Sequence, residues 1–374
     1  MIVLKPFLCL IVIAVSICAA LPKSLHSTTA ELAHGLHNPR GLIPLANGDL
    51  IILEAGTGEK LVGQYSGKIS RWSDVDQDRQ VDPPERTFLR EDLYSYNIME
   101  VFNPGRDEVV GLGDGLLRND QTLIYTRDTG RETTEVVQLD LDDLSEDVLI
   151  ERPGVVNSIT LSTDQQTLFL AESTLNQIGA YHIESGYEEV LLFDVLENQQ
   201  QAVPTGLTLD AEGNLIVSLF SGQLWAYYGE TISFMPGDAK IARVDLTKRT
   251  YEYIAEGLTT AIDVVTDHDD NIYFLEMTTA WPSNLISRDF DLYDKNSPPD
   301  PGGYMRNSGR LSVLLNGSKE RRILVEGLDL PTNLSILDHQ LYISTGQGTP
   351  GRKVWSEKGI FPIEGKILNY RITP

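Results

Sequence analysis

Short apolar runs separated by polar turns recur along the chain. Between residues 203 and 218, an apolar run, a turn containing Asp210 and Gly213, and a second apolar run follow one another, which predicts a β-hairpin. Residues 239–246 and 251–255 are predicted as a third and a fourth strand, and the pattern restarts at residue 261. A four-strand unit that restarts itself is typical of a propeller blade.

The second strand of this unit has counterparts throughout the chain. Each follows a polar turn, and they begin at Leu50, Leu123, Leu168, Leu215, Ile272 and Leu341. Intervals of about 45 to 70 residues leave room for one blade and its loops. The sequence therefore predicts an all-β fold, a six-bladed β-propeller with four-stranded blades. The last blade ends one strand short at residue 371, so we expect residues 29–34 to add its outer strand and to cover the exposed sheet edge.

The first twenty residues follow a different pattern. Lys5 precedes an apolar run from Phe7 to Ile17, and small residues follow at Ala19 and Ala20. These features predict a secretory signal peptide, residues 1–20, because the run is too short for a membrane span. We therefore expect one propeller domain, residues 21–374, exported to a periplasmic or extracellular location and not inserted in a membrane.

Amino-acid composition excludes cysteine chemistry and limits the kinds of partner that the chain can bind. The chain has only two cysteines, Cys9 and Cys18, and both lie in the predicted signal peptide, so the remaining chain has no disulfide, thiolate metal site or cysteine nucleophile. The formal net charge of −24 argues against nucleic acid and anionic membrane surfaces as partners. It favours solubility and attracts cations, calcium included.

Two long insertions interrupt the repeats. The longer, residues 281–307, contains a Pro- and Gly-rich stretch and several aromatic residues, and the shorter, residues 221–237, is also aromatic. Loops of this length are often functional. They are expected either to cover one face of the propeller or to pack along its side.

Equivalent positions of the blades are expected to converge on the central channel. At the start of the first strands, candidate ligand-binding residues are Arg40, Asn157, Thr205, Asp263 and Thr332, with Asp114 as a further member. At the end of the second strands, the candidates are Arg127 and three carboxylates considered as catalytic groups, Glu54, Glu172 and Glu276. The carboxylates are expected either to bind a cation or act in acid–base chemistry, or to form structural ion pairs.

An acidic segment forms a separate candidate metal site. Its acids have the spacing of a calcium loop, and they are Asp74, Asp76, Asp78, Asp82 and Glu85. Arg79 stands where the turn of an EF-hand needs Gly, and Pro83 and Pro84 block an exit helix. The sequence thus excludes an EF-hand and leaves two alternatives, Ca²⁺ on an irregular loop or a solvated acidic turn.

Several strings carry a family resemblance. They are the stretches 38–42, 53–56, 204–207, 261–264 and 275–277, and the Gly-rich stretch 346–351 before 365–367. In this order they resemble exported six-bladed propellers of the ScyD/ScyE type, whose blades are NHL-like. The resemblance covers nearly all of residues 21–374 and implies the fold, but no biochemical activity.

A wider resemblance is to the SMP-30/gluconolactonase and strictosidine-synthase-like propellers. The lactonases of that group hold a divalent metal on a Glu, an Asn and an Asp at the propeller centre. Asn157 matches the Asn, whereas Arg40 and Thr205 stand at the Glu and Asp positions. These departures argue against metal-dependent lactonase chemistry. Quinone-dependent sugar dehydrogenases share the architecture, but the six histidines here show no arrangement that matches their catalytic His.

Three function classes follow from these observations. The first is an exported propeller that binds a small molecule or a protein partner at one face of the channel. The second is an enzyme, either a metal-assisted, lactonase-like hydrolase or another metabolite enzyme that uses the channel carboxylates. The third is an extracellular scaffold.

Overall fold

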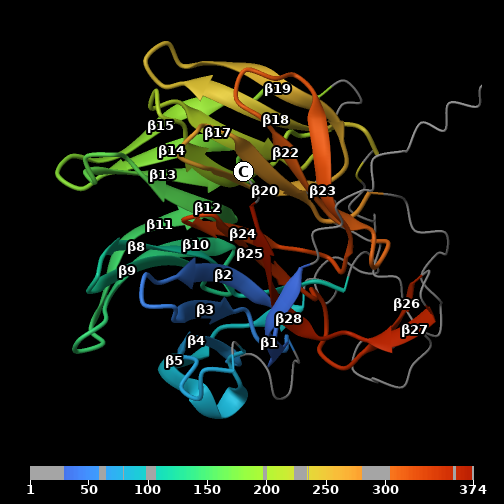
Figure 1. The fold of residues 1–374 in the computed structure, drawn as a ribbon. Coiled ribbons are helices and arrows are strands. Elements are labelled where there is room, and N and C mark those ends of the chain that lie inside the picture. Colours follow the sequence, from blue (N-terminus) through green and yellow to red (C-terminus); the bar gives the residue numbers. More distant parts are fainter. Residues whose placement is uncertain are drawn as a thin grey trace, which may run out of the picture.

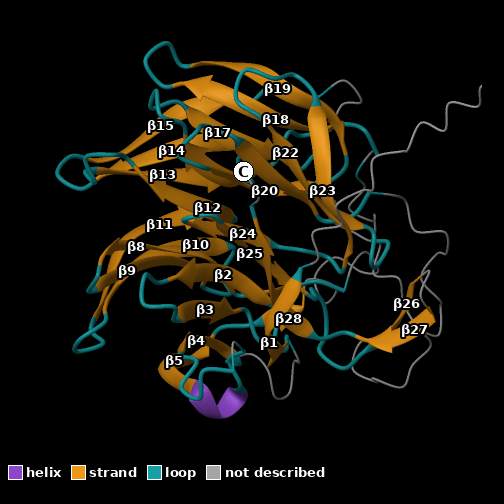
Figure 2. Ribbon diagram, viewed as in Figure 1, coloured by secondary structure: helices purple, strands orange, loops and turns teal. Residues whose placement is uncertain are grey.

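Six four-stranded antiparallel sheets lie around a central axis in the computed structural model (Figure 1). The structure describes residues 29–58, 65–78, 80–97, 107–196, 200–222, 234, 236–279, 304–356 and 359–372. The predicted signal peptide lies outside these residues. Strands account for nearly all the regular structure (Figure 2), and no helix among the described residues is long and apolar enough to cross a membrane.

The blades follow one another along the chain, each running from its innermost to its outermost strand. Blades one to three comprise β2 (Pro39–Pro44), β3 (Leu50–Glu54), β4 (Gly67–Trp72) and β5 (Arg86–Leu93); β8 (Leu112–Asn119), β9 (Thr122–Asp128), β10 (Thr133–Asp140) and β11 (Glu146–Pro153); and β12 (Val156–Leu161), β13 (Thr167–Glu172), β14 (Gln177–His182) and β15 (Gly186–Leu192). The predicted second strands of these blades are confirmed as β3, β9 and β13.

Blades four to six repeat the arrangement. They comprise β16 (Pro204–Leu209), β17 (Leu215–Leu219), β18 (Ala239–Asp245) and β19 (Thr250–Leu258); β20 (Ala261–Thr266), β21 (Ile272–Glu276), β22 (Gly309–Leu314) and β23 (Arg321–Leu328); and β24 (Asn333–Leu337), β25 (Gln340–Thr345), β28 (Gly365–Arg371) and β1 (Ala30–Leu36). The other described elements are two strand pairs and one 3-10 helix, namely β6 (Tyr96–Asn97) with β7 (Val109–Val110), β26 (Lys353–Ser356) with β27 (Gly359–Pro362), and η1 (Pro83–Glu85).

The core lies between neighbouring blades. The second strands β3, β17 and β21 are buried along their whole length because each blade packs against another on both faces. Between blades one and two, for example, Leu53 and Ile69 pack with Tyr125 and Val137. Burying a side chain of this size contributes about 1.5–3 kcal/mol, so the inter-blade layers supply most of the stability.

The two ends of the described chain meet in blade six, as the sequence predicts. Strand β1 pairs antiparallel with β28, with Ala30 opposite Asn369 and Leu36 opposite Gly365. Figure 1 shows the blue β1 beside the red β28. The pairing covers the edge of β28 and closes the ring of blades.

A second contact supports this closure. The Gly-rich segment after β25 bonds to the start of blade one, where the Asn38 side chain donates to the carbonyls of Gly56 and Gly348. Arg352 forms a buried ion pair with Asp107 at 3.0 Å. The Gly-rich stretch that carries part of the family resemblance therefore holds blade six against the segment between blades one and two.

Candidate functional site at the central axis

A repeated irregularity in the innermost strands builds the centre of the propeller. Five of these six strands change register against the second strand near their start, for example between Pro39 and Gly41 and between Val156 and Ser158. A β-bulge of this kind adds one residue and re-aims the side chains around it. Consecutive residues such as Asn157 and Ser158 therefore both line the axis.

The axial cavity brings the first predicted set of residues together. It is lined by Arg40, Gly113, Asp114, Asn157, Ser158, Thr205, Ile262, Asp263, Thr332 and Asn333. Its volume is about 20 Å³. This is room for about one water molecule, so a larger ligand must bind at the mouth of the cavity.

Two carboxylates meet at the bottom of this cavity. Asp114 of blade two and Asp263 of blade five lie on opposite blades, and the Asn333 amide donates to both, at 3.3 and 3.0 Å. Ser158 and the N–H of Ile159 and Gly115 also donate to Asp114. The N–H groups of Leu334 and Val264 donate to Asp263.

The environment of this pair opposes its ionisation. Burial raises the pKa of Asp114. Burial, followed by the negative charge of Asp114, raises the pKa of Asp263 well above its usual value. Gly206 leaves room for the Asp263 side chain, because a Cβ there would lie 2.4 Å from its Oδ1. The fold thus places two strongly interacting carboxyl groups, Asp114 and Asp263, at the axis.

Arg40 is a further lining residue of this cavity. Its Nη2 donates to Glu108 at 3.1 Å and to the carbonyl of Val109 at 2.9 Å. Thr205 donates to the carbonyl of Ala261 at 3.0 Å, and Asn157 donates to Ser173 at 2.6 Å. A cationic side chain and two bonded neutral groups therefore occupy the three positions compared above, and they do not fit a divalent metal in this cavity.

A second cavity of about 90 Å³ adjoins the first. Arg40, Gly113 and Asn157 line both, and the second cavity also reaches Glu108, Thr126, Asp128 and Thr134. Burial raises the pKa of Asp128 to about 6, although hydrogen bonds from Gly130 and Tyr96 lower it. We call the two adjoining spaces the central-face cavity.

Sequence analysis missed six polar residues of this cavity: Glu108, Thr126, Asp128, Thr134, Ser158 and Asn333. Ser158 and Asn333 each follow a predicted residue, and in blade three the bulge brings both members of the pair to the axis. Asp128 follows the predicted Arg127 by one position. A search that included both neighbours of each predicted residue would have found four of the six, since Thr126 also neighbours Arg127.

The structure does not bring the three predicted catalytic glutamates together at the axis. Among the described residues, each is buried within its own blade and lines neither part of the central-face cavity. Glu54 pairs with Lys68 at 3.5 Å and Arg86 at 3.8 Å, and burial raises its pKa.

The other two glutamates are also held by nearby side chains, Glu276 by partners in its own blade and Glu172 by partners in its own and the preceding blade. Glu172 bonds to Arg152, Gln177 and Tyr187. Glu276 pairs with Arg310 at 2.6 Å and Arg321 at 3.3 Å. Side chains of a strand point to the faces of its sheet, so these positions face partners on the third and fourth strands of the blade, and in the case of Glu172 also on the neighbouring blade, instead of the channel.

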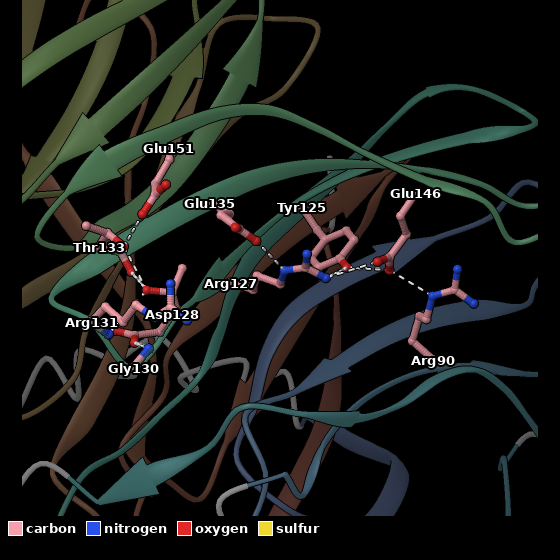
Figure 3. A network of polar contacts seen from close by, with 11 residues as sticks. Arg90, Tyr125, Arg127, Asp128, Gly130, Arg131, Thr133, Glu135, Glu146 and Glu151 are labelled. Atoms are coloured by element: carbon pink, nitrogen blue, oxygen red, sulfur yellow. Dashed lines mark hydrogen bonds and ion pairs between the residues drawn. The ribbon is translucent and has the colours of Figure 1, made fainter.

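Arg127 also differs from its predicted place. It points along blade two, where it bonds to Glu135 at 2.8 Å and Glu146 at 3.0 Å (Figure 3). Glu146 in turn accepts a bond from Arg90 of blade one at 2.8 Å. Arg127 is therefore part of a network that ties blade two to blade one.

The acidic segment is brought together in part. Oxygen atoms of Asp74, Asp76 and Asp78 lie within 4.8 Å of one another. Glu85 instead accepts bonds from the N–H groups of Val75, Asp76 and Asp82, and it forms a capping box with Asp82 at η1. Three of the five predicted ligands therefore cluster, and the other two stabilise the helix.

The predicted face-covering insertions fall largely outside the described residues. Two described members do meet, since Phe234 and Tyr304 stack with ring centroids 5.6 Å apart. Both rings are buried in a cluster with Phe220 and Met277. The two insertions are therefore joined at this point, beside blades four and five.

Comparison with known proteins agrees with this architecture. One similar structure is the PQQ-bound aldose sugar dehydrogenase of Streptomyces coelicolor. The match covers 92% of this chain and 98% of the dehydrogenase, with 13% sequence identity and a TM-score of 0.55. A proposed gluconolactonase is matched over 94% of its length and 92% of this chain, with 12% identity and a TM-score of 0.51. These likenesses show the fold alone.

Sequence comparison identifies the family. No curated protein matches the chain. The family model described as "SMP-30/Gluconolactonase/LRE-like region" matches residues 45–257, which is more than half of the chain. The matched range begins just before β3 and ends within β19, so it spans parts or all of blades one to four. This six-bladed propeller belongs to the SMP-30/gluconolactonase/LRE-like family.

Proposed function

We propose that this propeller binds a small polar molecule at the central-face cavity. The observation that carries the proposal is the convergence of side chains from several blades on one continuous space. Arg40, Asn157 and Asp128 come from blades one, three and two, and all line it. Ligand sites typically combine such a concave space with a few polar groups of fixed orientation.

The charges of the cavity favour an uncharged, hydroxylated ligand. Arg40 is already paired with Glu108, and Asp128 adds a second carboxylate to the wall. An anionic ligand would be repelled by this balance. A hydroxyl group, in contrast, donates well to a carboxylate and accepts from the Asn157 amide.

A second candidate function is the hydrolysis of a lactone at the same place. Membership of the SMP-30/gluconolactonase family favours it. Because Arg40 stands where a metal ligand would be needed, this chemistry would use the protein's own acid and base groups. If neither binding nor turnover is found, the extracellular scaffold becomes the preferred function.

Thermal unfolding tests the binding proposal. The midpoint would be measured against a panel of sugar lactones, free sugars, aromatic metabolites, divalent cations and quinone cofactors. A ligand that binds only the folded protein raises the midpoint with its concentration. A shift with a hydroxylated compound supports the proposal, and the absence of a shift with every compound contradicts it.

Four predictions from the sequence stay open beside this proposal. Calcium at Asp74, Asp76 and Asp78 rests on their clustering alone. Export rests on residues 1–20, and N-terminal sequencing of the protein from an exported fraction would find Leu21 first if the predicted cleavage occurs. The closer resemblance to the ScyD/ScyE type, and any protein partner at the cavity face, also stay predictions.

A further inference from the structure

Asp128 lines the central-face cavity and is also bonded to the turn at Gly130. It ends β9 and lines the second part of the central-face cavity together with Arg40 and Asn157. Its own N–H donates to the carbonyl of Gly111 at 2.8 Å. The backbone at this point is therefore fixed against the start of β8.

Two groups hold the carboxylate itself. The N–H of Gly130 donates to its Oδ1 at 2.6 Å, and Tyr96 of β6 donates its phenol proton (Figure 3 shows Asp128 beside Gly130, apart from the Arg127 network). Gly130 has a φ of 72°, and a Cβ there would lie 2.4 Å from the Tyr94 ring. Only glycine fits this turn, so the turn and the tyrosines fix the orientation of Asp128.

We propose that Asp128 is the general base of the central-face cavity and that Tyr96 is its positioning residue. This inference rests on the hydrolytic function proposed above. The geometry supports this role of Asp128. Gly130 and Tyr96 donate hydrogen bonds to its carboxylate, and Asp128 still lines the cavity that a ligand would enter.

The titration of Asp128 suits this role. Burial raises its pKa to about 6, so the carboxylate is mostly ionised at neutral pH and still accepts a proton readily. Tyr96 faces it from β6 with Tyr94 beside it, Arg40 and Glu108 lie in the same cavity wall, and Arg131 lies in the adjoining turn (Figure 3). Arg127 of its own strand is bonded to Glu135 and Glu146 instead.

In the proposed reaction, Asp128 takes up one proton and returns it, so the carboxylate is regenerated. The Asp128 carboxylate takes a proton from water as the water oxygen bonds to the lactone carbonyl carbon. The ring C–O bond then breaks, and the ring oxygen leaves with the proton that Asp128 returns. The net reaction is lactone plus water to hydroxy acid, and no further reactant is needed.

The test follows the hydrolysis of glucono-δ-lactone by proton release between pH 5 and 8, corrected for the spontaneous reaction. In the wild type, kcat/KM is expected to rise with pH through a midpoint near 6. Asp128→Asn is expected to lower kcat/KM by about 100-fold or more at pH 7. Tyr96→Phe removes a bond that lowers the pKa of Asp128, so the midpoint is expected to move to higher pH.

Asp140→Asn is the matched control. Asp140 lies at the other end of the β9–β10 pair, and its carboxylate also accepts N–H bonds from a turn, at 2.8 and 3.2 Å. This variant is expected to retain the wild-type rate and pH profile. The thermal midpoint of each variant reports whether it is folded.

The outcomes separate the two proposals. Turnover that persists in Asp128→Asn with an unchanged pH profile overturns the role of Asp128 and leaves the hydrolytic function standing. Turnover by Tyr96→Phe with an unshifted midpoint overturns its positioning role. No turnover by the wild type overturns the hydrolytic function and, with it, the role of Asp128, whereas binding of the same compound would keep the binding proposal.

Discussion

The Asn333 amide provides the sharpest test of the axial acid pair. It is 5% exposed and donates to both Asp114 and Asp263. Replacing it with Ala removes two hydrogen bonds to carboxylates that burial already destabilises. A hydrogen bond to a charged group contributes about 1.5–3 kcal/mol. The longer of the two bonds is weaker, so we expect Asn333→Ala to lower the free energy of unfolding by about 3 kcal/mol at pH 8.

The loss is expected to depend on pH. The pKa values of both aspartates are raised in the folded protein, so their contribution to stability is fully present below the ordinary Asp pKa and is lost as pH rises through the raised values. Removing the amide raises these values further. At pH 4.5 the pair holds more protons, and the loss is expected to fall to about 1 kcal/mol, as for bonds to neutral groups.

Urea unfolding of both proteins at pH 4.5 and pH 8, followed by tryptophan fluorescence, measures this difference. Asn316→Ala is the control, because Asn316 is an exposed amide that donates to the carbonyl of Asp269 at 3.0 Å. Its effect is expected to stay within about 0.5 kcal/mol at both pH values. An Asn333→Ala loss that is equal at both pH values, or below that of the control at pH 8, would refute the reasoning.

Three further predictions concern features outside the cavity. Glu276→Ala leaves the guanidinium groups of Arg310 and Arg321 without their shared carboxylate, so we expect a loss of about 3–5 kcal/mol in urea unfolding, whereas an enzyme that needed Glu276 in catalysis would lose turnover at unchanged stability. Asp76→Ala is expected to abolish a calcium-dependent rise in the thermal midpoint, and the absence of any rise in the wild type with excess calcium would remove this site. Deleting residues 30–36 exposes the edge of β28, so the thermal midpoint is expected to fall by several degrees, and an unchanged midpoint would show that the closure adds no stability.

The fold could be predicted from the sequence because its signal is repeated. Each second strand is a run of apolar residues such as Leu50 to Leu53, preceded by a polar turn, and six copies leave little ambiguity. The outer strand of blade six was also predictable, since the last blade lacked one strand and β1 lay at the other end of the repeats.

The site was predictable only in part, for a local physical reason. Aligned strand starts indicate which blade positions approach the axis, and Arg40, Asn157 and Thr205 line it as expected. The bulges then turn a second residue inward, which sequence periodicity does not reveal. In the register of the sheets, Ile262 is therefore the residue equivalent to Arg40. Asp263 is equivalent to Gly41, one residue further along the strand than the sequence repeats indicated.

The glutamates show a different limit. Their recurrence at the ends of second strands was correctly recognised as a pattern. Its cause, however, is nearby basic residues, which lie on the same blade for Lys68 beside Glu54 and Arg310 beside Glu276 and on the neighbouring blade for Arg152 beside Glu172. Partners separated by tens of residues in the sequence become neighbours only once the register of the sheet is known.

The central claim is that a ligand binds at the cavity shared by Arg40, Gly113 and Asn157. Its most direct test is the dissociation constant of the compound that raises the thermal midpoint most, measured by calorimetry for the wild type, Asn157→Ala and Asp140→Asn. The account predicts about tenfold weaker binding to Asn157→Ala, the equivalent of one lost hydrogen bond, and unchanged binding to Asp140→Asn. Equal affinity of all three proteins would contradict it and place the ligand elsewhere on the propeller.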